Sequence, residues 1–400
     1  MQTKKIIMVV SDFPVYSETF ILNKFKGLAG KLNISIFSIG RKNHKNLKNF
    51  PEFKNRVRYT WPASPAWKPV LLYPFFLLRC FFLNPFGVIS YFLKGFRVCG
   101  FSIFKNFYLD GELVLLSPDV LHYEFGALAA KKTYLKEILS CKLIVSFRGY
   151  DINFSGLEKK DYYKQVWDQA DALHFLGDDL WQHAQKRGCP PGKKHVLISP
   201  AIDANFFAPA NEKQTTVEEP VRILSVGRLE WKKGYEFALQ TMCLLKDQKI
   251  SFEYKIAGEG NYFESVVFCR RQLGLDKEVI FLGKKNSEEI KAELQRADIF
   301  VHSAVSEGFC NAVLEAQAME IPVVTSDADG LQENIQNGVT GFIVPRRNPE
   351  AMAEKIINLI QNPELRRNMG EKGRERVLKF FKIEDQIKSF ENFYSDILKT

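Results

Sequence analysis

The chain has 400 residues, 46% of them hydrophobic, and a formal net charge of +10. This length is too great for one ordinary hydrophobic core, so we expect two domains. Seven cysteines lie singly and six histidines show no metal-ligand spacing, which excludes a disulfide framework and indicates reduced thiols in a cytoplasmic protein. The apolar run at residues 6–10 is too short for a signal peptide and predicts a first strand.

The positive charge is concentrated in the N-terminal quarter of the chain. Residues 1–100 hold 16 Lys and Arg against 3 Asp and Glu, whereas residues 201–400 hold 27 against 31. A basic surface attracts anions such as nucleic acids, acidic lipid headgroups or phosphorylated substrates. No nucleic-acid-binding motif accompanies it, so we expect no nucleic-acid partner. A solvated surface that favours solubility is the alternative explanation of this charge.

Short apolar runs alternate with helical patterns along the chain. Strands that alternate with helices of about 10–15 residues predict βαβ units and parallel sheets. The first series of predicted strands covers residues 5–11, 33–39, 119–125, 142–149 and 172–177. The second series covers residues 221–229, 252–260, 279–284, 298–304, 322–327 and 341–345. Two series predict an α/β protein with two doubly wound domains.

The predicted junction between the two series is the polar, unpatterned stretch at residues 208–220. We therefore expect an N-terminal domain at residues 1–205 and a C-terminal domain at residues 206–379. The last stretch, residues 380–399, has helical spacing.

Residues 69–107 are rich in aromatic and aliphatic side chains. Arg79, Lys94 and Arg97 interrupt them, and the longest uncharged run, residues 80–93, has 14 residues. A membrane span needs about 20 apolar residues, so we exclude a transmembrane helix here. Two interpretations remain: a buried helical hairpin packed on the N-terminal sheet, or an interfacial helix whose aromatic side chains lie among lipid headgroups.

The stretch SEGFCNAVLEAQAMEIPVV, residues 306–324, places two carboxylates around the start of a predicted helix. Glu307 lies on the loop at the carboxyl end of a predicted strand, where open α/β sheets bind ligands. Asn311 is predicted to cap the helix, so Glu315 is expected in its first turn. Both carboxylates could accept hydrogen bonds from sugar or ribose hydroxyls. A capping and dipole role is the alternative for both.

The same helix start offers backbone N–H groups to an anion, with the helix dipole in support. The residues expected to bind the anion here are Gly308, Phe309, Cys310 and Asn311.

Basic and glycine-rich loops follow the first two strands of the second series. GRLEWKKG places Arg228 and Lys233 after the first of them. Arginine offers a fork for phosphate oxygens, and lysine a mobile point charge. AGEG places Gly258 at the end of the next strand; a lone G-x-G is weak, and a plain turn is the alternative.

Together these residues resemble the glycosyltransferase family 4 group of GT-B transferases. The resemblance covers residues 220–365, with five motifs in order: GRLxxxKG, AGxG, FLG, EGFxxxxxEA and GxxExxxxGxxG. FPVYSETFI, residues 13–21, is similar to a variant found in polysaccharide-assembly members. The resemblance implies the GT-B fold, in which two Rossmann-like doubly wound domains face a cleft. It also implies that the C-terminal helix, residues 380–400 here, packs back on the first domain.

The resemblance further implies roles for the site residues. Arg228 and Lys233 would neutralise the diphosphate of a nucleotide-diphospho-sugar donor. Glu307 would contact the transferred sugar and Glu315 would hold the ribose. Transfer would retain the anomeric configuration and would need neither a metal nor another cofactor.

The first domain departs from the family pattern in two places. FPVYSE, residues 13–18, stands where many members have a Gly-rich loop, and Arg148 in SFRGYD replaces a histidine. Arg148 remains a candidate catalytic residue because it could contact donor phosphate or sugar, although it cannot act as a base. His122 ends a neighbouring strand, and a buried structural histidine is the preferred interpretation. Asp151 is expected to cap a helix.

We expect the enzyme to extend a surface polysaccharide or a lipid-linked glycan, with a nucleotide-sugar donor and a glycan acceptor as partners. The basic, aromatic N-terminal domain suits a lipid-linked acceptor, so a cytoplasmic location with peripheral attachment to the inner face of the membrane is expected. The alternatives are a soluble GT-B sugar synthase and a non-catalytic sugar-nucleotide-binding assembly protein. Asp327-Ala328-Asp329 matches a D-x-D metal motif of another glycosyltransferase fold, but a turn is its expected role.

Overall fold

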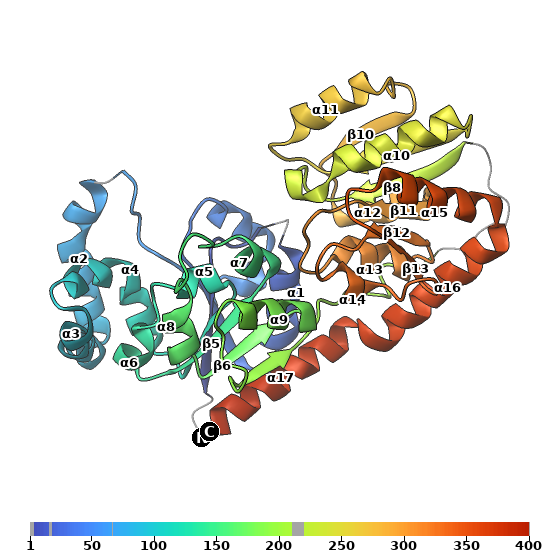
Figure 1. Cartoon of the computed structure of the whole chain (residues 1–400). Coiled ribbons are helices and arrows are strands. Elements are labelled where there is room, and N and C mark those ends of the chain that lie inside the picture. The colour runs from blue at the N-terminus through green and yellow to red at the C-terminus, as the bar shows by residue number, and fades with distance from the viewer. Residues whose placement is uncertain (1–3, 16–17, 66, 210–219, 400) are drawn as a thin grey trace. The chain divides into compact units, whose positions relative to one another are not determined.

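The computed structural model describes residues 4–15, 18–65, 67–209 and 220–399. The chain divides into two compact units, each with one parallel sheet and its helices (Figure 1). The first unit consists of Met1–Leu176, Leu180–Ile198 and Ile387–Thr400, and the second of Gly177–Asp179 and Ser199–Gln386. Most of the junction predicted at residues 208–220, namely 210–219, lies outside the described residues. So do Tyr16 and Ser17 of the N-terminal motif.

The sheet of the first unit has seven strands in the order β3-β2-β1-β4-β5-β6-β7. All paired strands in it run parallel. The five predicted strands are present, because each is an apolar run that the sheet buries on both faces. The bounds are β1 Lys5–Val10, β2 Asn33–Ser38, β3 Val57–Tyr59, β4 Val120–Tyr123, β5 Lys142–Phe147, β6 Ala172–Phe175 and β7 His195–Leu197.

Ten α-helices accompany this sheet among the described residues. Their bounds are α1 Thr19–Ala29, α2 Trp67–Leu83, α3 Pro85–Cys99, α4 Ser102–Leu116, α5 Gly126–Ala129, α6 Leu135–Leu139, α7 Gly149–Asn153, α8 Lys164–Gln169, α9 Asp178–Lys186 and α17 Ile383–Lys399. Two 3₁₀ turns, His44–Asn49 and Pro51–Phe53, precede β3.

The aromatic stretch at residues 69–107 forms α2, α3 and the start of α4. Helices α2 and α3 pack on α4, and Figure 1 shows them on its far side from the sheet. Only Phe76 and Cys80 of α2 and Val88, Tyr91 and Gly95 of α3 are buried. The predicted buried hairpin on the sheet is therefore wrong.

No single described helix is long and apolar enough to cross a membrane. Helices α2 and α3 pass that test only when taken together, and they are bent by 117° at the break between them.

A buried polar cluster fixes α17 to the first sheet. The ring of His122 on β4 is hydrogen bonded through Nδ1 to the Tyr394 hydroxyl of α17 and through Nε2 to Ser146 Oγ, both at 2.7 Å. Ser146 Oγ also lies 2.7 Å from Nδ1 of His174, whose Nε2 lies 3.0 Å from the carbonyl oxygen of Ile198. His122 is fully buried and the interpretation as a structural histidine agrees with these contacts.

A buried ion cluster lies at the carboxyl ends of β4 and β5. Glu124 accepts hydrogen bonds from Lys24 Nζ at 2.6 Å and from an Arg148 guanidinium nitrogen at 2.9 Å. Burial lowers the pKa of Lys24 to about 8, although Glu124 opposes the shift. Because one carboxylate pairs with two cations, removal of Glu124 would take the ion-pair partner from Lys24 and one of the neighbouring carboxylates from Arg148.

We expect the first unit to lose stability as the pH falls below about 6.5. Burial, together with the charges of Lys24 and Arg148, holds the pKa values of His122 and His174 well below 6.5. Below this pH the histidines bind protons in the unfolded chain but not in the folded one. Each histidine therefore lowers the free energy of unfolding by roughly 1.4 kcal/mol per pH unit. Urea titrations at pH 7.0 and 5.5, followed by tryptophan fluorescence, would measure the loss.

Four of the five tryptophans lie in the first unit, so the fluorescence reports mainly on it. His122→Asn should flatten the acid dependence, although it lowers stability at pH 7. His44→Gln is the matched control, because His44 is exposed and its loss should leave the slope unchanged. Equal stability of the wild type at both pH values would contradict the argument.

The sheet of the second unit has six parallel strands in the order β10-β9-β8-β11-β12-β13. All six predicted strands are present, and its core is aliphatic. The bounds are β8 Val221–Val226, β9 Phe252–Ala257, β10 Val279–Gly283, β11 Ile299–His302, β12 Val323–Ser326 and β13 Gly341–Val344. The first strand, β8, lies between β9 and β11, so the strand order reverses there.

The helices of the second unit cover its sheet as the βαβ pattern predicts (Figure 1). Their bounds are α10 Tyr235–Asp247, α11 Phe263–Gln272, α12 Ser287–Arg296, α13 Asn311–Ala318, α14 Leu331–Asn334, α15 Pro349–Gln361 and α16 Pro363–Phe380, with a 3₁₀ turn at Trp231–Lys233.

Candidate active site

The candidate site lies where the strand order of the second sheet reverses. The loop after β8 carries Lys233, and the loop after β11 carries Glu307. Two hydrogen bonds join the two loops. The backbone N–H of Val305 donates to the Lys232 carbonyl oxygen at 2.8 Å, and the Ser303 hydroxyl donates to the Gly234 carbonyl oxygen at 2.8 Å. Open α/β sheets bind ligands at this position, outside the carboxyl ends of the strands.

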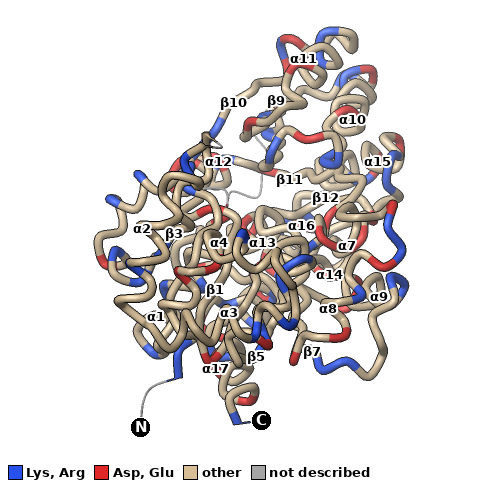
Figure 2. Tube along the Cα trace, turned by 90° about the vertical axis from the view of Figure 1, so that its left-hand side faces the viewer, with Lys and Arg blue, Asp and Glu red and all other residues tan. Residues whose placement is uncertain are grey.

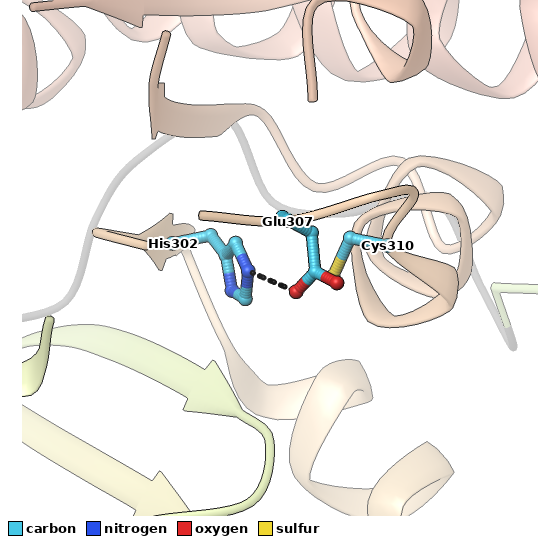
Figure 3. A group of neighbouring side chains, drawn as sticks. All are labelled: His302, Glu307 and Cys310. Atoms are coloured by element: carbon cyan, nitrogen blue, oxygen red, sulfur yellow. Dashed lines mark ion pairs between the residues drawn. The ribbon is translucent and has the colours of Figure 1, made fainter. Parts of the chain in front are cut away.

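Glu307 is the centre of a cluster of charged side chains. Its Oε2 pairs with the ammonium of Lys233 and lies 3.5 Å from Nε2 of His302, the last residue of β11. The side chains of His302, Glu307 and Cys310 point toward one another (Figure 3). Sequence patterns did not single out His302, although its place at the end of a strand before the EGF motif is a usable signal.

Charged neighbours shift the pKa values of the side chains in this cluster. Burial by itself would raise the pKa of Glu307, but the charge of Lys233 and the neighbouring His302 ring lower it well below its ordinary value. Burial opposes the charge on Lys233, yet Glu307 raises the lysine pKa. The pKa of His302 is raised to about 9, against the effect of burial, by the neighbouring Cys310 and Glu307. Lys233 and His302 therefore both lie against the Glu307 carboxylate, and the Lys233 ammonium is the positive charge that an anionic ligand would meet.

Three of these side chains could also hold a metal ion. Ligand atoms of His302, Glu307 and Cys310 lie within 4.8 Å of one another, a nitrogen–oxygen–sulfur set that zinc accepts. The ammonium of Lys233 is already paired with Glu307, so a metal would have to compete with it.

The two aspartates of the D-x-D sequence, Asp327 and Asp329, bind side chains of neighbouring loops. Arg346 Nε donates to Asp327 Oδ1 at 3.1 Å, and a guanidinium nitrogen of Arg346 donates to Asp329 Oδ1 at 3.3 Å. Ser306 Oγ donates to Asp329 Oδ2 at 2.6 Å. The two aspartates therefore tie loops together, as expected of a turn.

The start of α13 differs from the prediction by one residue. Cys310 is the N-cap residue and Asn311 is the first helical residue, so Asn311 is not the cap. The reason is a tertiary contact: the Asn334 side chain accepts from the Cys310 N–H at 3.1 Å and donates to the Cys310 carbonyl at 3.0 Å. The Cys310 N–H is thus occupied. The N–H groups without an intrahelical acceptor belong to residues 311–313, because that of Leu314 is the first to bond back, to Cys310.

Glu315 consequently lies in the second turn of α13, and the first-turn prediction is wrong. Its carboxylate is half-buried and burial raises its pKa to about 7. Among the described residues no side chain or backbone group pairs with it. A carboxylate kept partly buried without a partner destabilises the fold, and binding of a hydroxyl-rich ligand would supply the missing hydrogen bonds.

Gly308 and Phe309 shape the loop that leads into α13. A Cβ at Gly330 would lie 2.0 Å from the Gly308 carbonyl oxygen, so only glycine allows the two loops to meet. The Phe309 ring is buried against Phe381, with ring centroids 5.8 Å apart.

Arg228 and Gly258 lie on the two neighbouring loops. The Arg228 side chain is 60% exposed and pairs with Glu230 at 3.0 Å, so it is free to turn toward a ligand. A Cβ at Gly258, where φ is +153°, would lie 1.9 Å from the Gly227 carbonyl oxygen. Gly258 therefore brings the two loops together instead of offering a side chain.

Arg148 lies in the first unit, at the carboxyl end of β5. Its Nε donates to the Glu124 carbonyl at 3.1 Å, and its guanidinium stacks over the Phe20 ring at 3.9 Å. Asp151 accepts the Arg148 N–H at 3.1 Å, in the capping geometry expected for it. These contacts favour a structural role for Arg148 over the donor contact that the sequence suggested.

Two doubly wound α/β units, with charged loops at the reversal point of the second sheet, define a GT-B type of glycosyltransferase architecture. The chain matches the family model "Glycosyl transferases group 1" over residues 208–376. It is also 30% identical over 378 residues to the amylovoran biosynthesis glycosyltransferase AmsK of Erwinia amylovora, covering 89% of this chain and 91% of the relative. The chain belongs to the group 1 family of glycosyltransferases, and the predicted fold and family are confirmed.

Other similar proteins agree with this assignment. The capsular polysaccharide biosynthesis glycosyltransferase CapM of Staphylococcus aureus is 40% identical over 174 residues, 44% of this chain and 46% of the relative. Among solved structures, Anabaena Alr3699/HepE in complex with UDP and glucose superposes with a TM-score of 0.75, at 14% identity, over 98% of this chain and 100% of that one. At such identity the structural likeness supports the fold alone.

Proposed function

We propose that the protein is a retaining glycosyltransferase that moves a sugar from a nucleotide-diphospho-sugar to a growing polysaccharide or lipid-linked glycan. The observation that carries the proposal is the Lys233–Glu307 pair at the reversal point of the second sheet, on the loops that lead to the first amides of α13, which have no intrahelical acceptor. The names of AmsK and CapM, which describe polysaccharide biosynthesis, support the acceptor class.

In this proposal the cations stabilise the leaving diphosphate. The bond between the anomeric carbon and the diphosphate breaks, and the electron pair leaves with the diphosphate oxygen. Lys233, Arg228 and the amides of residues 311–313 then face the developing negative charge with dipoles and charges already in place. In the absence of donor, the opposite charges of Lys233 and Glu307 neutralise each other, so neither is buried without a counter-ion.

The two glutamates bind hydroxyl groups of the donor. Glu307 accepts hydrogen bonds from the transferred sugar, and Glu315 accepts them from the ribose diol. Neither carboxylate is required as a covalent nucleophile. The acceptor hydroxyl oxygen bonds to the anomeric carbon on the face that the diphosphate leaves, and its proton passes to the leaving diphosphate oxygen, so the configuration is retained.

No metal is needed in this scheme, because Lys233 and Arg228 supply the positive charge that a divalent cation supplies elsewhere. Treatment with EDTA should leave transfer unchanged. A loss that zinc or manganese restores would instead assign a metal to His302, Glu307 and Cys310.

Thermal stabilisation by UDP, GDP, ADP and CMP, with and without EDTA, tests the donor site. A ligand present at about 100 times its dissociation constant should add roughly 2.7 kcal/mol to the free energy of unfolding. One nucleoside diphosphate that stabilises the protein, insensitive to EDTA, would support the proposal and identify the base. If none stabilises it, and no donor hydrolysis or transfer is found, the donor site assignment fails.

Glu315→Gln should stabilise the ligand-free protein while weakening the response to nucleotide. Burial raises the pKa of Glu315 to about 7, so ionisation costs stability as pH rises from about 4.5 to 7. The neutral amide removes this cost, and we expect a melting temperature higher by about 2 °C or more at pH 8. The gain on adding the active nucleotide should shrink, because the ribose loses an ionised acceptor. A variant that melts lower and responds fully would contradict both roles.

A further inference from the structure

The outer side of α2 and α3 carries many exposed apolar side chains that the proposed active site does not use. All but one of the exposed apolar residues of α2 recur at helical spacing and form one face: Trp67, Val70, Leu71, Pro74, Phe75, Leu78, Phe81 and Phe82. On α3, all but one form a second face: Phe86, Ile89, Leu93 and Phe96. Single exposed apolar side chains are ordinary, but a contiguous surface of this kind marks an interaction site.

Two of the most exposed aromatic rings lie at the break between the two helices. Phe82 is 80% exposed and Phe86 is 85% exposed, on either side of Asn84. The Asn84 side chain accepts from the Gly87 N–H at 2.9 Å, which caps α3, and donates to the Val114 carbonyl of α4 at 3.1 Å. The bend of 117° is therefore fixed to the body of the first unit, and two phenyl rings project from it.

The positive charge around this surface indicates an anionic partner. Residues 53–109 contain eight Lys and Arg and no Asp or Glu. Figure 2 marks the acidic and basic positions along the chain. Arg97 on α3 and Lys105 on α4 are both exposed beside the apolar faces. A second copy of the same surface would bring like charges together, whereas anionic lipid headgroups complement them.

We propose that the α2–α3 elbow, residues 67–99, docks the enzyme on an anionic lipid surface, with Phe82 and Phe86 inserted among the headgroups. An amphipathic element of this composition lies in the interface plane and does not cross the bilayer. The inference deepens the proposed function, because the acceptor of a lipid-linked glycan is presented at such a surface. It stands on the surface of the first unit alone.

Vesicle flotation of the full chain tests the proposal. The protein should float with vesicles of phosphatidylethanolamine and phosphatidylglycerol, and less with phosphatidylcholine alone. The doubly substituted Phe82→Ser/Phe86→Ser protein should partition at least tenfold less. Phe268→Ser is the matched control, since Phe268 is 65% exposed on α11 of the second unit. It should float like the wild type.

A charge variant separates the two contributions. Arg97→Glu/Lys105→Glu should reduce binding to anionic vesicles and leave the weaker binding to neutral ones unchanged. Added salt should mimic it, because screening weakens the attraction.

Two outcomes would overturn the proposal: a wild type that stays at the bottom of the gradient with every vesicle, or a dimer that Phe82→Ser/Phe86→Ser dissociates and that binds no vesicles. The second would make the elbow an interface between copies of this chain. Thermal stabilisation by nucleotide, measured on the same variants, distinguishes a failure of the membrane proposal from a failure of the donor site. Phe82→Ser/Phe86→Ser should still be stabilised by nucleotide. If the wild type is not stabilised, the donor-site proposal is wrong, and the flotation result still stands by itself.

Discussion

Lys233→Met is expected to lower the rate of sugar transfer by about 10²–10³-fold, the usual cost of removing one preorganised charge from a site of this kind. Methionine keeps the length and apolar character of the lysine stem, so the fold should survive. Glu307 would lose its buried counter-ion and the donor diphosphate its nearest cation. Steady-state kinetics with the donor found by thermal stabilisation would measure the effect, mainly in kcat/KM.

The neighbouring residue provides the control. Lys232→Met changes the same side chain one position earlier, where the ammonium pairs with Glu230 at 3.3 Å instead of Glu307. We expect it to keep activity within a few-fold of the wild type. If Lys233→Met is equally active, Lys233 does not belong to the site.

Glu307→Gln should cost a comparable factor, and the double variant should be little worse than either single one. The two side chains form one ion pair, so their contributions are expected to be non-additive. If the two losses multiply in the double variant, the residues act independently, and the interpretation of a shared role in the donor site would be wrong.

The central strands were predictable because burial on both faces leaves an apolar signal in the chain. The strands missed, β3 and β7, have three residues each, too few to show a pattern. Helices α2 and α3 were predicted as helices, and of the two interpretations left open for them the buried hairpin was wrong. Both are apolar on much of their circumference, so composition cannot tell the side that packs on α4 from the side that faces outward.

The candidate site was predictable as far as its order along the chain. Lys233 and Glu307 were both identified, but their direct pairing depends on the adjacency of β8 and β11, which start 78 residues apart in the sequence and lie side by side in the sheet. The helix start shifted from Asn311 to Cys310 because of Asn334, a contact that no local capping rule contains. His302 joined the site for the same reason: tertiary structure places it beside Glu307.

The ion cluster of the first unit shows the same limitation more strongly. Lys24 and Glu124 are separated by 100 residues, and Glu124 and Arg148 by 24. Arg148 was noticed only because it replaces a histidine of the family pattern, and its partner was not. The structure explains why an arginine is retained there: it completes a buried set of charges and stacks on Phe20.

Glu124→Gln is expected to destabilise the first unit by about 3–5 kcal/mol, because Lys24 loses its ion-pair partner in a buried place and Arg148 loses its paired carboxylate. Urea unfolding followed by tryptophan fluorescence would measure the loss. Glu137→Gln, at an exposed carboxylate on α6, is the control and should change stability by less than about 0.5 kcal/mol. Adding Lys24→Met to Glu124→Gln should recover part of the loss, since one unpaired charge is then removed.

The donor apparatus proposed here lies in the second unit, so the Glu124 variant separates stability from chemistry. At a temperature where it is still folded, it should keep the nucleotide stabilisation of the wild type. A loss below about 1 kcal/mol would mean that water or rearrangement compensates the two cations. A fully stable variant that has lost transfer would return Arg148 to the group of residues that contact the substrates, as the sequence first suggested.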